Sequence, residues 1–348
     1  MRFFICILWV ICFNINAQEI KTFQDEKNYS FCWNTEKIDD EILTDPRKIE
    51  SDSEGNVYIL DRGDNFIKIF DLQGNFIAKF GGKGKDPGEF IQPVEFFTDS
   101  QNRKYIYDLQ LGKLNIFSSE NQFVKALPLP GLVEKIRKIK NGFIIQSCRF
   151  VYKQSVRIKK YTYTIYDENL KNRKDFYSSE FKKAVKRKNA LVYIPFASDD
   201  FWEILDEDRI LIFDSEEFRV LVFDENGIKI KDEKFDGKRE KISQTEKEEI
   251  FKVFSERIKR IKLKFSDIEF PSRKPFFQQI MKINDHLILL SSEKDNKYLL
   301  FDSEGNLKGE RKFPDKYINH KSRVFHNRII VNKFTEDGVS IISAYKLN

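Results

Sequence analysis

A short pattern of residues recurs five times along the chain, and this repeat constrains the fold more than any other feature. In each copy an aromatic residue ends a strand-like run, and a polar turn follows it directly. Aspartate in such a turn accepts hydrogen bonds from nearby backbone, while glycine or asparagine takes the left-handed conformation. The copies begin at Phe70, Phe117, Tyr166, Phe223 and Phe301.

An apolar strand precedes each of these copies. The five strands are VYIL (57–60), KYIYD (104–108), GFIIQ (142–146), RILIF (209–213) and HLILL (286–290). Alternating apolar residues punctuated by turns predict a four-stranded antiparallel unit. Repeats of about 40 to 50 residues are typical of β-propellers, in which each unit forms one blade.

A sixth unit near the C-terminus lacks one strand. RIIVNKF (328–334) and SIISAYKLN (340–348) match its second and third strands, but no fourth strand follows. A free sheet edge has to be paired or covered, and the alternating segment YSFCWN (29–34) has no partner of its own. We therefore expect an all-β fold, a six-bladed β-propeller closed by an N-terminal strand in the last blade.

The segment GGKGKDPGEF (81–90) is glycine-rich, as phosphate-binding loops are. A phosphate loop would end in Gly-Lys-Ser/Thr and begin a helix, whereas here Asp86-Pro87 follows and the next segment is aromatic. The flanking strands instead predict a hinge between two blades. Its glycines would permit the turn, and Phe90 would pack between the blades.

The segment GNVYILDRGDNFIKIFDLQGNFIAKFGGKGKDPGEFIQP resembles an NHL repeat, including its Gly-rich link with Pro-Gly-x-Phe. The resemblance is specific over residues 52–93, weaker over 94–130, and limited to the architecture beyond. With its leader, the whole chain resembles the exported six-bladed β-propeller proteins of Gram-negative bacteria, a group that largely lacks assigned activities. The resemblance implies the fold and identifies no ligand.

The first 17 residues have the features of a secretory leader. Arg2 precedes an apolar run from Phe3 to Phe13, which is shorter than the roughly 20 residues of a membrane span. We expect a signal peptide over 1–17 and a propeller over 18–348, exported to the periplasm or the cell exterior without a transmembrane anchor. Neither Cys6 nor Cys12 follows a small residue, which argues against a lipoprotein.

Two cysteines remain after the leader, Cys32 and Cys148. The predicted fold places them on opposite sides of the ring, beyond the roughly 7 Å limit for α-carbons in a disulfide. We therefore expect two free, unreactive thiols. The formal net charge of +6 is spread along the chain. Together with export, this spread argues against a nucleic-acid partner, and we expect a monomer.

Three segments are longer than the repeat requires: the links 178–200 and 236–276, and a loop near 149–158. They belong to blades three, four and five and are expected on one face of the ring. Within the second link, Ser243 and Glu246 form a capping box, which predicts a helical insertion at about 238–265 between blades four and five.

The predicted helix carries apolar residues at helical spacing: Ile250, Phe254, Ile258 and Ile261. Such a stripe is most often buried against the rest of the protein. A lid or a partner-binding element is the alternative. The basic run 182–189 is interpreted as a solvated surface.

Few residues suggest catalysis. The three histidines, His286, His320 and His326, all lie in the last two units, whereas a catalytic zinc needs three converging ligands. No cofactor is expected, although calcium stays open because its oxygen ligands follow no fixed linear motif. The candidate ligands are Asp61, Asp108 and Asp214, which follow equivalent strands; turn capping is the other interpretation.

The sequence leaves enzymatic activity uncertain and favours a non-enzymatic binding or scaffold protein. Its loop-rich face would bind a peptide, a glycan or a protein of the cell envelope. Arginine and aromatic side chains contribute most to binding, so the candidate contacts are Arg62, Arg149, Tyr152, Lys153 and Trp202, with a core position as the alternative for Trp202. The rival hypotheses are a calcium-dependent hydrolase or lactonase with carboxylates at the channel mouth, and a structural envelope subunit that uses the helix as its interface.

Overall fold

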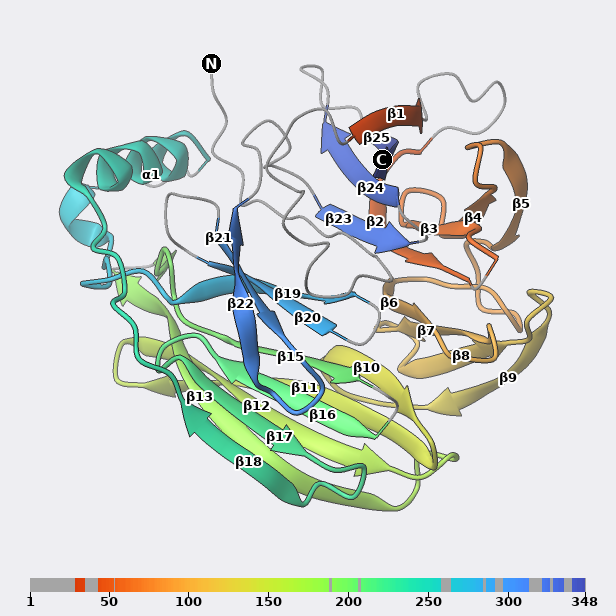
Figure 1. The fold of residues 1–348 in the computed structure, drawn as a ribbon, viewed down its shortest axis with the longest axis horizontal. Helices are drawn as coiled ribbons and strands as arrows, with labels where there is room; N and C mark the ends of the chain where they lie inside the picture. The colour runs from red at the N-terminus through yellow and green to blue at the C-terminus, as the bar shows by residue number, and fades with distance from the viewer. Residues whose placement is uncertain are drawn as a thin grey trace.

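Six separate antiparallel sheets are arranged around a ring, so the predicted all-β six-bladed propeller is confirmed (Figure 1). The computed structural model describes residues 29–34, 43–52, 54–187, 190–205, 208–257, 264–283, 286–291, 297–312, 321–325, 328–334 and 340–347. The signal peptide, with its cleavage site and the question of a lipid anchor, lies outside these residues, and so do His320 and His326.

Blades one and two have the predicted four strands each. Blade one consists of β2 (Pro46–Ser51), β3 (Val57–Asp61), β4 (Phe66–Phe70) and β5 (Phe76–Gly81). Blade two consists of β6 (Pro93–Thr98), β7 (Lys104–Asp108), β8 (Lys113–Phe117) and β9 (Phe123–Pro128). In both sheets the strands pair in chain order.

Blade three is larger than the repeat predicts, with five strands. They are β10 (Val133–Ile139), β11 (Gly142–Lys153), β12 (Val156–Tyr166), β13 (Arg173–Arg187) and β14 (Ala190–Tyr193). Blade four returns to four strands: β15 (Asp200–Leu205), β16 (Arg209–Asp214), β17 (Arg219–Phe223) and β18 (Lys229–Lys234).

Blade five contains β19 (Phe277–Ile283), β20 (His286–Ser291), β21 (Lys297–Phe301) and β22 (Leu307–Lys312). The sixth sheet has the order β1-β25-β24-β23. Its strands are β1 (Tyr29–Asn34), β23 (Lys321–Phe325), β24 (Arg328–Phe334) and β25 (Ser340–Leu347). Closure of the ring by the N-terminal strand stays a prediction and is taken up under Proposed function.

The burial of the strands follows from their order within a blade. All five residues of β3 and all five of β7 are buried, because both faces of a second strand lie against neighbouring blades. The outermost strand β5, by contrast, alternates between half-buried and exposed residues. The first strands lie innermost, where β6 contacts both β2 and β10. A blade therefore buries its apolar faces only through its neighbours.

The repeated Asp turns have the predicted chemistry. In the first copy, Asp71 Oδ1 accepts hydrogen bonds from the backbone N–H groups of Gln73 and Asn75, both at 2.8 Å. Gly74 has φ +86°, in the left-handed region. The turns at Asp224 and Asp302 repeat this arrangement.

The segment 81–90 is the predicted hinge between blades one and two. Gly81 has φ +93°, and a Cβ atom there would lie 2.4 Å from a ring carbon of Phe90. Phe90 is fully buried and packs with Leu60 and Ile67 of blade one and with Phe117 of blade two. The glycine thus makes room for the aromatic ring that joins the two blades.

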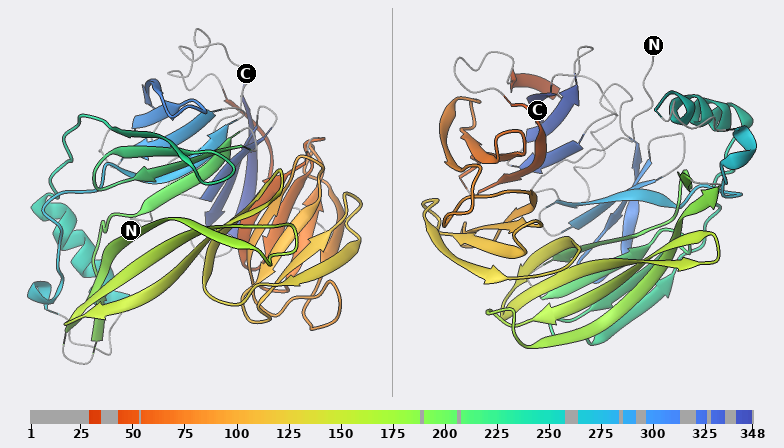
Figure 2. Two further views of the ribbon diagram at one scale, coloured as in Figure 1. Left: turned by 90° about the horizontal axis from the view of Figure 1, so that it is seen from below. Right: turned by 180° about the vertical axis from the view of Figure 1, so that it is seen from behind.

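Two of the three predicted loops are strands, which corrects the sequence interpretation. Residues 149–158 are not a long loop, because β11 and β12 continue to a two-residue turn at Gln154 and Ser155. The link 178–200 is largely β13 and β14. The extended strands reach beyond the neighbouring blades on the side that carries the helical insertion (Figure 2, left). We call this extension, residues 149–160, 180–187 and 190–193, the wing.

The helical insertion is confirmed, with α1 spanning Gln244–Arg257, followed by a short 3-10 helix at Phe265–Asp267. Ser243 Oγ accepts from Glu246 N at 3.2 Å, and Glu246 Oε2 accepts from Ser243 N at 2.9 Å, as a capping box requires. Lys274, which is 4% exposed, ties the base of the insertion to Glu240 at 2.6 Å. Helix α1 stands at the side of the ring and does not cover it (Figure 1).

Only part of the apolar stripe of α1 falls within the described residues. Ile250 and Phe254 are half-buried, while Ile258 and Ile261 lie outside the part of the chain that the structure describes. Phe251 packs within the insertion, 5.5 Å from Phe265 between ring centroids. The insertion therefore packs in part against itself.

Candidate functional site

The predicted metal ligands Asp61, Asp108 and Asp214 lie at the ends of β3, β7 and β16, as expected. Their carboxylates accept backbone hydrogen bonds. Asp108 Oδ2 accepts from Ile91 N at 2.6 Å and from Gln92 N at 3.0 Å, and thereby ties the link from blade one to blade two. This is the turn-capping role that the sequence analysis gave as the alternative.

Asp61 is fully buried and accepts the most hydrogen bonds of the three. Its oxygens accept from the backbone N–H groups of Thr44 at 2.8 Å and Asp45 at 2.7 Å. The Nζ atom of Lys68 lies 3.0 Å away and is itself buried. Burial opposes ionisation, but these donors outweigh it and hold the pKa of Asp61 below its ordinary value. The carboxylate is thus engaged inside the protein.

Asp214 caps its own turn, accepting from Glu216 N at 2.7 Å and from Glu217 N at 3.1 Å. Within the described ranges, no three His, Cys, Asp or Glu side chains lie close enough to hold a metal ion. The calcium hypothesis therefore gains no support from these carboxylates. The side chain of His286 is not among those described.

A chain of ion pairs, built on the buried carboxylates of Glu95 and Glu203, connects the innermost strands of four blades. Lys48 on β2 lies 2.5 Å from Glu95 on β6, and Glu95 lies 3.0 Å from Arg137 on β10. Arg137 in turn contacts Glu203 on β15 at 2.8 Å. Glu95 is 2% exposed; burial opposes its ionisation, but Lys48 and Arg137 outweigh this and lower its pKa.

Lys135 completes this axial ion-pair chain by binding Glu203 at 2.8 Å. Burial, together with the nearby Arg137 charge, lowers the pKa of Lys135 to about 8, while Glu203 acts in the opposite direction. Because each charge has an internal partner, we assign this chain a structural role. No local motif marks it, since its members are far apart in sequence.

The wing of blade three carries an exposed group of aromatic and cationic side chains. Phe150 is 38% exposed, and Tyr152 and Tyr193 are each 56% exposed. The guanidinium carbon of Arg157 lies 3.6 Å from the centroid of the Phe150 ring, and Arg157 Nη1 donates to Tyr193 Oη at 3.3 Å. We call Phe150, Tyr152, Arg157 and Tyr193 the aromatic platform.

Strand pairing explains why these residues share one face. Tyr152 pairs with Arg157, Arg157 with Ala184, and Ala184 with Tyr193, which forms a row across four strands. Phe150 lies two residues before Tyr152 and so points to the same side of the sheet. The sequence analysis named only Tyr152 of this group, because it interpreted the segment as a loop and did not use its alternation.

The remaining predicted contacts are dispersed. Arg149 and Lys153 lie on β11, on the opposite face from Tyr152, and Lys153 pairs with Glu180 at 2.9 Å. Arg62 is exposed at the end of β3, in blade one, where its Nε atom donates to Asp45 at 3.1 Å. The five candidates therefore do not form one site.

Trp202 is a core residue, which corrects its selection as an exposed contact. It is 1% exposed and packs with Tyr163 at 5.9 Å between ring centroids. Its Nε1 donates to Gln146 Oε1 at 2.9 Å, so its one polar group is satisfied. Trp202 joins blade four to blade three and cannot reach a ligand at the surface.

Asp200 at the start of β15 is a buried carboxylate that the sequence analysis did not identify. It is 6% exposed, and Oδ2 accepts from Tyr163 Oη at 3.3 Å and from Ser179 Oγ. Burial raises the pKa of Asp200 to about 7; the carboxylates of Asp214 and Asp199 add to this rise, against the effect of the Ser179 bond.

Cys148 is a buried free thiol. Burial raises its pKa to about 12, and the hydrogen bond to Glu134 at 3.0 Å acts in the same direction. The expectation of an unreactive thiol at this position agrees with both observations, because the thiolate is the reactive form. The side chain of Cys32 is not among those described.

Replacing Glu203 with glutamine tests the axial ion-pair chain. The Glu203→Gln variant leaves Lys135 without a carboxylate and weakens the pairing of Arg137, which should cost about 3–5 kcal/mol of unfolding free energy at pH 7. Burial opposes the ionisation of Glu203, but Arg137 and Lys135 outweigh it and lower the pKa of Glu203. Its stabilising effect should therefore disappear as the pH falls through and below the ordinary value of 4.5. Denaturant unfolding from pH 3 to 8 measures both effects.

The exposed Glu168, which pairs with Lys138 at 2.7 Å, provides the matched control. Glu168→Gln should cost at most about 1 kcal/mol. Equal losses for the two variants would contradict a structural role for the chain.

Asp200→Asn tests the buried carboxyl group. Because folding raises the pKa of Asp200, the folded state binds its proton more tightly than the unfolded state. Wild-type stability should therefore fall, relative to the variant, as the pH rises from about 4 to 7. The difference should reach roughly 2–4 kcal/mol.

Chemical denaturation at pH 4.5 and 8 measures this difference for Asp200→Asn. The Asp208→Asn variant, at an exposed position, corrects for the loss of one surface carboxylate. Parallel pH profiles for wild type and Asp200→Asn would show that the interpretation is wrong.

Comparison with known proteins agrees with the architecture. Residues 34–199 match the sequence profile of a family described as 6-bladed beta-propeller. No curated protein matches the sequence. A "putative exported protein" from Bacteroides fragilis NCTC 9343 has a similar structure, with a TM-score of 0.56 and 11% identity over 97% of this chain and 98% of that chain.

Two further structures show weaker similarity. A member of the duf4221 family from Bacteroides vulgatus ATCC 8482 has a TM-score of 0.47 and 10% identity, over 99% of each chain. Virginiamycin B lyase from Staphylococcus aureus has a TM-score of 0.47 and 11% identity, over 92% of this chain and 100% of that chain. At such identities the similarity concerns the fold alone.

The described residues contain no helix with both the length and the apolar character needed to cross a membrane. The repeat, the six sheets and the matched profile lead to the same assignment. The chain is a six-bladed β-propeller whose residues 34–199 match the family of that description.

Proposed function

We propose that this protein is an exported, non-enzymatic propeller that binds a peptide, a glycan or a protein of the cell envelope through the aromatic platform. The observation that carries the proposal is the exposure of three aromatic rings arranged around Arg157. Large apolar side chains on a surface usually mark an interaction site when they form a group. Tyrosine and arginine are also the residue types most often found at binding hot spots.

The platform suits ligand binding because it is built before the ligand arrives. Arg157 is held by the ring of Phe150 and by Tyr193 Oη, so little side-chain entropy is lost when a ligand docks. Tyr152 and Tyr193 offer ring faces for stacking and hydroxyl groups for hydrogen bonds. Paired strands, which are more rigid than loops, position all four residues.

The axial ion-pair chain is a less suitable binding surface, because its charges already pair with one another. A ligand there would have to compete with the contacts of Glu95 and Glu203 to Arg137. The hydrolase alternative needs converging oxygen ligands, and the described carboxylates do not provide them. The apolar leader supports export, which would place the platform in the envelope or outside the cell.

Array binding tests the proposed function. The mature protein should bind a subset of envelope glycans or peptides, and the Tyr152→Ala/Tyr193→Ala variant should lose at least tenfold in affinity because it removes two stacking surfaces. Ile77→Ala, at a 52% exposed residue of blade one, is the control and should bind as the wild type does.

Thermal unfolding should be unchanged in both variants, since the three residues are more than half exposed. The proposal fails if the tyrosine variant keeps full affinity, or if no class of envelope ligand binds the wild type.

We also propose that the N-terminal strand closes the ring. The pairing of Tyr29–Asn34 with Ser340–Leu347, in which Ser30 lies opposite Lys346, supports this. A chain that starts at residue 35 should then unfold at a lower temperature, because β25 would have a free edge. Restoring residues 29–34 should restore the melting temperature, whereas equal stability of the two chains would contradict closure.

A further inference from the structure

The wing of blade three is far more basic than the chain as a whole. Its residues 149–160, 180–187 and 190–193 contain nine arginines and lysines and one carboxylate, Glu180, whereas the whole chain has 61 cations and 55 carboxylates. Glu180 lies on the face opposite the aromatic platform, where it pairs with Lys153 at 2.9 Å. The platform face of the wing therefore carries cations and no carboxylate of its own.

The half-buried lysines on this face are neutralised by residues outside the wing. Lys159 on β12 forms an ion pair with Glu134 of β10 at 2.9 Å. The Nζ atom of Lys183 lies 5.4 Å from the centroid of the Phe181 ring and 2.7 Å from the carboxylate of Asp199. Both carboxylates belong to segments next to the wing, so they neutralise the part of the face nearest the ring of blades. The outer part keeps its charge.

Arg157, at the centre of the aromatic platform, has no such partner. Within the described residues it forms no ion pair, and its hydrogen bond goes to a neutral acceptor, Tyr193 Oη, at 3.3 Å. Its Nε atom is buried and has no hydrogen-bond partner. A half-buried charge without a counter-charge is costly, yet the Phe150 ring holds the guanidinium in place. The position therefore suits a counter-charge that a ligand supplies.

Lys186 adds a second cation to the outer part of this face. It is exposed, and in the part of the chain that the structure describes it forms no ion pair. It lies two residues after Ala184, which pairs with Tyr193, so its side chain points to the platform side of the sheet. A ligand on the platform thus meets two cations. A guanidinium binds a carboxylate or sulfate group through two parallel hydrogen bonds.

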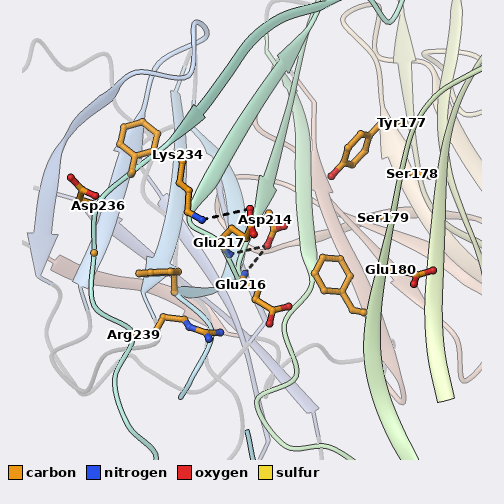
Figure 3. Close-up of a pocket in the computed structure, with 14 residues that line it drawn as sticks. Tyr177, Ser178, Ser179, Glu180, Asp214, Glu216, Glu217, Lys234, Asp236 and Arg239 are labelled. Carbon is orange, nitrogen blue, oxygen red and sulfur yellow. Dashed lines mark hydrogen bonds and ion pairs between the residues drawn. The ribbon is translucent and has the colours of Figure 1, made fainter. Parts of the chain in front are cut away.

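The neighbouring pocket between blades three and four is unsuited to such an anion. Its volume is about 570 Å³. Figure 3 shows Asp214, Glu216 and Glu217 gathered beside Lys234 on its blade four side. Among all its lining residues there are five carboxylates and two cations. An anionic ligand would be repelled there, which leaves the platform as the surface with the matching charge.

The arrangement of the rings favours an oligosaccharide over a protein surface. Tyr152 and Tyr193 end a row that crosses four strands, which places them roughly 14 Å apart at the usual strand spacing. Of the described wing residues, the exposed large apolar side chains are Phe150, Tyr152 and Tyr193, and none is aliphatic. The apolar core of a typical protein interface is therefore missing. Sugar rings can lie flat on tyrosine rings while their hydroxyl groups bond to the tyrosine Oη atoms.

We propose that the aromatic platform binds an acidic polysaccharide. Its sugar rings would stack on Tyr152 and Tyr193, while a carboxylate or sulfate group pairs with Arg157 and a second one is attracted by Lys186. This inference rests on the proposed function, because it names the class of ligand for the same surface. An acidic peptide would supply the charge without the rings, and a neutral glycan would supply the rings without the charge.

Calorimetric titration of the intact mature protein with five probes tests this proposal. The probes are hexagalacturonate and its methyl ester, sulfated maltohexaose and plain maltohexaose, and hexaglutamate. At least one acidic oligosaccharide should bind, and its neutral counterpart and the peptide should each bind at least about tenfold more weakly. The pair that responds distinguishes a carboxylate from a sulfate. Added NaCl should weaken the binding, because the charges lie at the surface.

Three single variants and one control locate the site. Arg157→Gln should weaken binding of the acidic oligosaccharide at least about tenfold, and Arg157→Lys, which keeps the charge but loses the paired geometry, should weaken it less. Lys186→Gln, at an exposed position, should also weaken binding, and it keeps the test valid if Arg157 proves necessary for folding. Lys160→Gln removes the same charge from the opposite face of β12 and should leave affinity unchanged.

Equal affinity for the neutral counterpart or for hexaglutamate would overturn the proposal. Equal effects of Lys186→Gln and Lys160→Gln, or no binding of either acidic oligosaccharide, would do the same. The Tyr152→Ala/Tyr193→Ala variant distinguishes this inference from the proposed function. If that variant loses an uncharged array ligand that Arg157→Gln still binds, the platform is a binding site but not for an acidic glycan. If it keeps every ligand, both proposals are wrong.

Discussion

Packing between blades is the constraint on which the rest of this structure depends. A four-stranded sheet with apolar residues on both faces cannot be stable alone, so each blade needs a neighbour on each side. Phe90 fills the junction between blades one and two, and Trp202 fills the junction between blades three and four. Ion pairs between the innermost strands, such as that of Arg137 with Glu203, tie the same blades together at the axis.

Because the junctions fix the ring, the segments that depart from the repeat lie outside it. Both departures from the repeat, the wing and the helical insertion, extend outward from blades three and four. The insertion is linked to the wing by Lys182 and Glu269. The aromatic platform lies on this side, on one face of the blade three sheet.

Local patterns in the sequence predicted the ring, its turns and the capping box of α1, because each depends on residues close together in the chain. Asp71 and Gly74 predict their turn from local residues alone, without reference to the rest of the fold. The wing was missed because residues in excess of the repeat were assigned to a loop, whereas φ +56° at Gln154 allows a two-residue hairpin turn. Asp200 and the axial ion pairs were missed for another reason: their environment comes from other blades, which no local pattern reveals.

Hydrogen-exchange mass spectrometry of the mature protein, with and without the tightest ligand from the array, tests the central claim most directly. A ligand that binds the aromatic platform should slow backbone exchange in residues 149–160 and 184–193, because it covers the outer strands of the wing. Exchange in β7 and β8 of blade two should not change. Protection confined to the innermost strands, or to blade two, would contradict the claim that the wing is the binding surface.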